Sequence, residues 1–76
     1  MKTFHIIEAK YFGWTNHKPP RIRLWSARFE QTIFILQDEY STGAEWLNKN
    51  GFNLVGAGYT KDKIIFVSDT FKPLKP

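Results

Sequence analysis

Five short runs of β-branched and aromatic residues, separated by glycine, proline or charged breaks, constrain the fold more than any other feature of this sequence. Such residues favour strands, and the breaks are typical of turns. The runs predict strands over residues 3–12, 21–29, 32–37, 52–60 and 63–68. We therefore expect the chain to pair these runs into a sheet and to bury one face of it.

The one helix signal lies between the third and fourth runs. Thr42 begins a capping box, in which its hydroxyl accepts from the Glu45 amide and the Glu45 side chain reaches back. Leu47 and Trp46 are placed for an apolar stripe, and Gly51 suits the left-handed residue just past the helix end. The helix is short, so its stability must come from docking on the sheet.

This order predicts an α+β fold: a five-stranded, mostly antiparallel sheet with one short helix, in the order β-β-β-α-β-β. The same order occurs in the partly closed OB-like barrel, which stays open as an alternative. We expect one domain over residues 1–69 and an irregular tail over 70–76, which contains two prolines.

The third run is nearly continuous in apolar residues, which favours a central strand covered on both faces. In the fourth run, Gly56 and Gly58 share one face. That pair indicates either close packing of a ring or the helix backbone there, or a strongly coiled strand.

The second run alternates clearly between two faces. Ile22 and Leu24 point one way, whereas Arg21, Arg23 and Trp25 point the other way. Two guanidinium groups and an indole therefore form one stripe along this strand. Such a stripe can hold phosphates while the ring stacks on a base, or the arginines can simply stack on a tryptophan that covers the sheet.

Composition narrows the class of protein. The 76 residues make one domain, and the absence of cysteine excludes disulfides and thiolate zinc sites. We expect a cytoplasmic protein, because the absence of cysteine fits a reducing compartment. The N-terminus lacks the long apolar run of a signal peptide, and no run approaches the ~20 apolar residues of a membrane span. The net charge of +4 is uneven: residues 1–28 and 49–76 are basic, and residues 29–48 are acidic.

The hairpin between the first two runs carries a recognisable pattern. Its residues are Lys10-Tyr11-Phe12-Gly13, Thr15-Asn16 and Arg21-Ile22-Arg23. This pattern resembles small phage and plasmid proteins that read Lys-Tyr-Leu-Gly-x-Thr-Asn, a short basic loop, then Arg-Ile or Arg-Val and a basic residue. The sequence departs from it at Pro19-Pro20, where Gly-Ser is more usual. The resemblance implies a mobile-element origin and a bacterial host, and it implies no activity.

Catalytic signals are weak. Nucleophilic catalysis needs a nucleophile beside a base that a third group orients. The two histidines, His5 and His17, lie far apart in sequence without a carboxylate cluster, which argues against a metal site as well. Gly56-x-Gly58 lacks the rest of a phosphate-binding fingerprint. We expect no enzyme activity, no cofactor and no metal.

Nucleic-acid binding through the basic, aromatic hairpin is the first functional prediction, with single-stranded nucleic acid as the partner. The candidate binding residues are Lys10, His17, Lys18, Arg21, Arg23 and Trp25, and Arg28 extends them.

The alternative is a non-catalytic module that occupies the surface of a host protein. Asp38, Glu39 and Glu45 would then mimic phosphates, and Trp14 or Trp46 would anchor the interaction. Homodimerisation through an exposed edge strand is a further option, and no membrane partner is expected.

Overall fold

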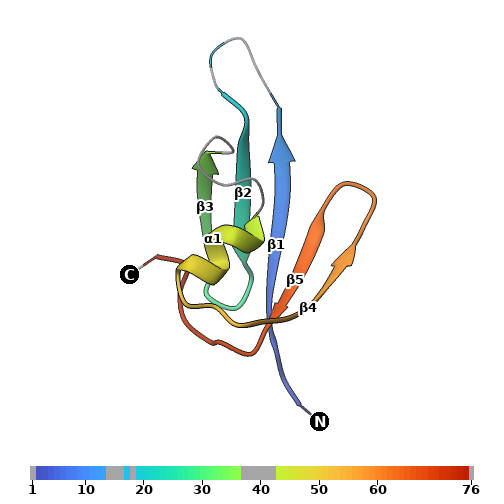
Figure 1. Ribbon diagram of the computed structural model, residues 1–76, viewed down its shortest axis with the longest axis vertical. Coiled ribbons are helices and arrows are strands. Elements are labelled where there is room, and N and C mark those ends of the chain that lie inside the picture. The colour runs from blue at the N-terminus through green and yellow to red at the C-terminus, as the bar shows by residue number, and fades with distance from the viewer. Residues whose placement is uncertain (1, 14–16, 18, 37–42, 76) are drawn as a thin grey trace.

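The computed structural model describes residues 2–13, 17, 19–36 and 43–75, and these form one sheet and one helix (Figure 1). The elements are β1 (His5–Phe12), β2 (Arg21–Ser26), β3 (Gln31–Leu36), α1 (Gly43–Lys49), β4 (Leu54–Tyr59) and β5 (Ile64–Ser68). The predicted α+β class, with five strands and one short helix, is confirmed.

The sheet has the order β3-β2-β1-β5-β4, and all its neighbours pair antiparallel. Strand β1 is central because it forms a hairpin with β2 and also pairs with the last strand, β5. Within the described residues no pairing joins the two edge strands, β3 and β4. The sheet is therefore open, and the OB-like alternative was wrong.

Helix α1 lies across one face of the sheet, in front of β2 and β3 in Figure 1. Alternate residues of the strands point to that face, as the two-residue period of a strand requires. The buried apolar residues of this layer are Ile7, Ala9, Ile22, Leu24, Ile35, Leu47, Phe52, Phe66 and Leu74. The prediction that Ile22 and Leu24 lie on the same face of the strand is confirmed.

The start of α1 lies against the sheet at very short range. A Cβ atom on Gly43 would lie 2.9 Å from Leu24 Cδ2 and 3.3 Å from Phe66 Cε2. Glycine thus lets the first turn approach the strands. The capping hydroxyl predicted at Thr42 lies outside the described residues.

The end of α1 is a Schellman motif. Phe52 N–H donates to Leu47 O at 2.9 Å, and Gly51 N–H donates to Asn48 O at 3.3 Å. Gly51 has φ 88°, the left-handed conformation predicted for it. The side chains of Leu47 and Phe52 are both buried in the core, so the same motif that ends the helix also fixes its docking.

Strand β3 corrects one expectation, because it is an edge strand and not a central one. Ile35 is buried on the helix side, but Phe34 and Leu36 are 56% and 44% exposed on the opposite face. The continuous apolar run therefore contributes Ile35 to the core and Phe34 and Leu36 to the exposed face. The preceding strand also ends earlier than predicted, at Ser26, since residues 27–30 form a turn in which Glu30 has φ 52°.

The glycines of β4 contradict one of the two alternatives expected for them. A Cβ on Gly56 would meet only Val67 Cβ, at 3.9 Å, and one on Gly58 would meet nothing within 4 Å. Among the described residues, therefore, no ring or helix backbone packs closely against them. The other alternative, a strongly coiled strand, stays a prediction.

A buried polar cluster joins the two ends of the chain. His5 and Ser26 are fully buried, with His5 Nε2 2.6 Å from Ser26 Oγ and His5 Nδ1 3.0 Å from Thr70 O. Beyond Thr70 the tail continues without regular structure and buries Leu74 in the core. The tail therefore passes along the end of the sheet that is lowest in Figure 1.

Among the described elements no helix is long and apolar enough to span a membrane.

Candidate nucleic-acid interface

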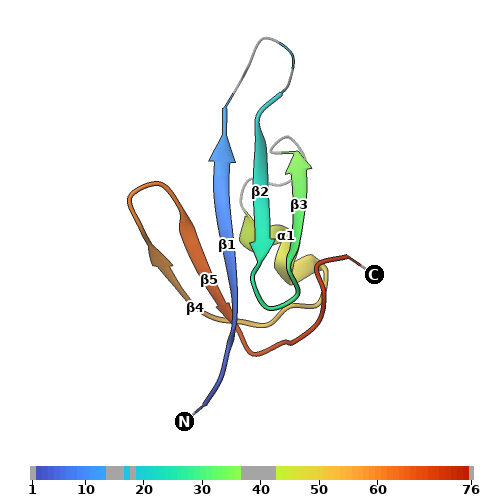
Figure 2. The ribbon, with the colours of Figure 1, turned by 180° about the vertical axis from the view of Figure 1, so that it is seen from behind.

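The face of β1, β2 and β3 opposite α1 gathers cations and rings. Figure 2 shows this face, with α1 behind the strands. The register places Lys10 opposite Arg23, Phe12 opposite Arg21, and Arg23 opposite Phe34. Directly opposed residues share a face, so six residues of three strands lie together. We call this surface the basic aromatic face: Lys10, Phe12, Arg21, Arg23, Trp25 and Phe34.

Within this face the cations lie over phenylalanine rings. Arg21 Cζ is 5.1 Å from the Phe12 ring centroid and 5.6 Å from that of Phe34. Arg23 Cζ and Lys10 Nζ approach the same Phe12 ring at 5.4 and 5.5 Å. The alternative in which the arginines stack on Trp25 is therefore replaced by one in which they stack on phenylalanine. These interactions hold the charged groups on the sheet surface.

The two arginines keep most of their hydrogen-bonding capacity for a ligand. In the part of the chain that the structure describes, no carboxylate pairs with Arg21 or Arg23. Arg21 Nη1 is the exception, because it is buried and therefore out of reach of a ligand, and it has no hydrogen-bond partner among the described residues. Lys10 forms a loose pair with Asp62, at 3.6 Å between Nζ and Oδ2. Glu8, the acidic residue nearby on β1, is neutralised by Lys63 Nζ at 3.0 Å.

The rings are open to solvent to different degrees. Phe34 is 56% exposed and Trp25 is 36% exposed, whereas Phe12 is half-buried beneath the cations. Exposed apolar side chains of Ile6 and Leu36 extend the same surface. A sheet face with exposed rings and cations is suited to stacking unpaired bases and pairing with phosphates.

The structure brings together four of the six predicted binding residues: Lys10, Arg21, Arg23 and Trp25. His17 is exposed in the connection between β1 and β2, and Lys18 lies outside the described residues. Arg28 lies in the turn after β2, at the other end of the sheet from Arg21. Its guanidinium is 4.8 Å from the Phe71 ring, so it does not extend the basic aromatic face.

Sequence reasoning missed Phe12 and Phe34. Phe12 is the last residue of β1 and Phe34 belongs to a strand that was expected to be covered on both sides. The alternation of each strand was a usable signal, because Phe12 follows Lys10 and Phe34 lies between inward-facing Ile33 and Ile35. Their convergence on Arg21 depends on the register of three strands.

The acidic surface of the alternative hypothesis is only partly described. Glu45 is exposed on α1, whereas Asp38, Glu39 and Trp14 lie outside the described residues. Trp46 is half-buried, packs against the core and lies 6.5 Å from the Phe52 ring centroid. It therefore supports the helix and is not an exposed anchor.

The pair of His5 and Ser26 has the distances of a base and a nucleophile. Because the Thr70 carbonyl only accepts, His5 Nδ1 donates to it, and in the neutral ring Nε2 accepts from the Ser26 hydroxyl. Both residues have no exposed surface, and the imidazole lies among the rings of Phe29, Phe52 and Phe71. No substrate reaches this serine, so we assign the pair to structure.

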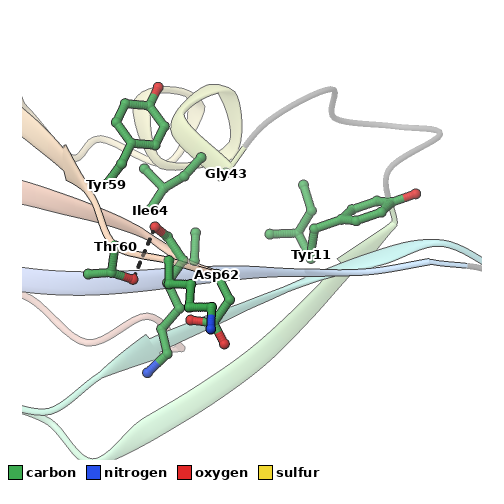
Figure 3. A pocket seen from close by; sticks show the side chains of 10 residues that line it. Tyr11, Gly43, Tyr59, Thr60, Asp62 and Ile64 are labelled. Atoms are coloured by element: carbon green, nitrogen blue, oxygen red, sulfur yellow. Dashed lines mark hydrogen bonds between the residues drawn. The ribbon is translucent and has the colours of Figure 1, made fainter.

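A pocket of about 380 Å³ opens on the other side of the sheet, near the start of α1. Figure 3 shows it between the β4–β5 hairpin, which carries Tyr59 and Thr60, and the end of β1, which carries Tyr11. Two of its ionic groups are paired, Asp62 with Lys10 and Lys63 with Glu8, and Lys61 also lines it. The lining therefore combines apolar residues with the hydroxyl groups of Tyr11, Tyr59 and Thr60.

No group of three or more potential metal ligands occurs among residues 2–13, 17, 19–36 and 43–75. The chain matches no family model, and neither the curated proteins nor the solved structures include a match to it.

Proposed function

We propose that this protein is a small, non-catalytic domain that binds single-stranded nucleic acid on its basic aromatic face. The observation that carries the proposal is the side-by-side placement of Lys10, Arg21 and Arg23 with the rings of Phe34 and Trp25, on a sheet face that α1 leaves open. The overall charge of +4 favours the approach of a polyanion.

Each part of the face has its own task. The guanidinium groups of Arg21 and Arg23 bind phosphates, for which their fixed planar donors are well suited. Phe34 and Trp25 stack on unpaired bases, and such stacking tolerates any base because every base has a π-face. The paired bases of a duplex do not expose these π-faces, so the site favours single strands.

The test measures binding of labelled single-stranded and duplex oligonucleotides by fluorescence anisotropy over a range of salt concentrations. Replacing Lys10 and Arg23 together by glutamine should weaken single-strand binding. The slope of log K against log salt should fall by about 0.7 for each phosphate group that the variant no longer neutralises. Phe34→Ala should cost about 1–3 kcal/mol for single strands and less for duplex.

The matched control replaces Lys49 and Lys75 by glutamine, which removes the same charge away from the basic aromatic face. Its affinity should stay close to wild type. Equally weakened binding in the two double variants would show a diffuse charge effect and would count against the site. Absence of binding by folded wild-type protein at low salt would end the proposal.

A second candidate is a module that occupies a host protein, in keeping with the mobile-element origin that the hairpin pattern implies. The exposed apolar groups of Ile6, Phe34 and Leu36 on one face favour it. Capture of a single protein from bacterial lysate that survives nuclease treatment and is abolished by Phe34→Ala would support this candidate over nucleic-acid binding. Both candidates place the protein in the host cytoplasm.

A further inference from the structure

The outer edge of β4 is an exposed edge of the sheet. Five of its six residues are exposed, and the stretch Gly56-Ala57-Gly58 has no side chain larger than a methyl group. Among the described residues, no atom lies within 4 Å of a Cβ built on Gly58, and only Val67 Cβ lies that near to one built on Gly56. The strand pairs with β5 on its inner side alone.

The devices that usually protect such an edge are missing over most of β4. There is no proline and no charged residue between Leu54 and Tyr59. A register shift between Leu54 and Gly56 disturbs only the start of the strand. At the opposite edge the tail lies beside the start of β3, where Lys75 N–H donates to Gln31 Oε1 at 3.1 Å.

The two ends of the β4–β5 hairpin present opposite charges to a partner, because at the turn Asp62 pairs with Lys10 and Lys63 pairs with Glu8. Exposed Lys61 lies at the hairpin turn, and exposed Asp69, held by Asn53 Nδ2 at 3.0 Å from both of its carboxylate oxygens, lies at the other end. An antiparallel pairing of two identical β4 strands brings the turn of each copy beside the Asp69 end of its partner. The edge is therefore complementary to itself.

We propose that β4 pairs antiparallel with β4 of a second copy, in a register centred on Gly56-Ala57-Gly58, to form a two-fold dimer with one continuous ten-stranded sheet. The unpaired backbone groups of both edges are then satisfied, and Lys61 of each copy approaches Asp69 of the other. In this register Tyr59, which is 81% exposed, shares a face with Ala57 of the facing strand and lies diagonally from it.

Dimerisation through β4 also affects binding on the basic aromatic face, and this consequence rests on the proposed function. Antiparallel pairing at one edge keeps equivalent sheet faces on the same side, because the two-fold axis is perpendicular to the sheet. The basic aromatic faces of the two copies then point in one direction, on either side of the axis. A single strand long enough to reach both faces binds with avidity.

The test is sedimentation equilibrium of the full chain from micromolar to millimolar concentration. Wild-type protein should rise from a mass of 9.0 kDa towards twice that value. Gly58→Lys and Gly58→Glu should each remain monomeric, because like charges meet close to the two-fold axis. Neither should unfold the monomer, since a Cβ atom at this position meets nothing within 4 Å and the strand is exposed.

Mixing the two charged variants supplies the decisive result. Equal amounts of Gly58→Lys and Gly58→Glu should associate as a heterodimer, whereas Gly58→Ala, the uncharged control, should dimerise as wild type does. A monomeric wild type at millimolar concentration would overturn the proposal. The partner of the β4 edge would then be an extended segment of another protein. Dimers of Gly58→Lys as stable as those of wild type would place the interface elsewhere and would also overturn it. Neither outcome bears on oligonucleotide binding by the monomer, which the anisotropy measurements test separately.

Discussion

His5 links three segments that are distant in sequence. Its ring joins β1 to Ser26 at the end of β2 and to the Thr70 carbonyl in the tail. Phe71 stacks on the imidazole with ring centroids 5.9 Å apart and an interplanar angle of 18°. Because the imidazole and the Ser26 hydroxyl have no access to water, each hydrogen bond in the cluster is costly to remove.

Ser26→Ala should lower the free energy of unfolding by about 1–3 kcal/mol, because it leaves His5 Nε2 buried without a partner. Chemical denaturation followed by tryptophan fluorescence measures the change. Thr3→Ala, which removes an exposed hydroxyl, is the control and should change stability little. Equal midpoints for wild type and Ser26→Ala would mean that the buried pair contributes nothing to stability.

At the scale of elements, α1 is a short helix that depends on docking. It has seven residues, and its buried ones are Gly43 and Leu47. Isolated helices of this length are unstable in water, so the helix forms because the sheet provides an apolar surface for it. The absent side chain at Gly43 determines how close the first turn comes to that surface.

Gly43→Ala should destabilise the protein, although alanine is the better helix former. The added methyl group would overlap Leu24, which is fully buried and cannot yield freely. Overpacking of a core typically costs about 1–3 kcal/mol, against at most about 1 kcal/mol gained in helix propensity. Thermal unfolding measures the balance.

Gly58→Ala, in which the methyl group meets nothing, is the matched control and should be neutral or slightly stabilising. A higher melting temperature for Gly43→Ala than for wild type would refute the close approach of α1 to the strands.

At the scale of the whole molecule, the tail completes the core. The lower end of the sheet is closed by residues that follow β5, including buried Leu74. Asn53 N–H donates to Thr70 Oγ1, and Asn53 Nδ2 bonds Asp69, so the start of the tail is also tied to the segment before β4. A small domain buries few apolar residues, so burial of Leu74 alone contributes noticeably to its stability.

Leu74→Ala should lower the free energy of unfolding by about 2–5 kcal/mol, the range for a buried leucine. Lys75→Ala, at the next and exposed position, should have almost no effect, since its backbone N–H still reaches Gln31. Urea denaturation of both variants tests the difference. Coincident curves for the two variants would show that the tail does not pack as described.

Local patterns predicted most of the elements. The five runs and the single helix occur in the predicted order, and alternation in β2 correctly separated Ile22 and Leu24 from Arg21, Arg23 and Trp25. These features depend on side-chain period and on backbone preferences at glycine, which act over a few residues. The Gly51 helix end was predictable for the same reason, because few other residues adopt a positive φ at low cost.

The tertiary structure alone decided which strands are central, which face stays open and which rings meet the arginines. The apolar run of β3 reads like a central strand although β3 is an edge strand. The reason is that its outward-facing residues, Phe34 and Leu36, are also apolar. Phe12 and Phe34 reach Arg21 only through pairings between strands, with partners far apart in the chain. Burial of Leu74 and pairing of His5 with Thr70 likewise depend on where the chain returns. Such interactions are set by the register and closure of the sheet, which no local stretch of sequence encodes.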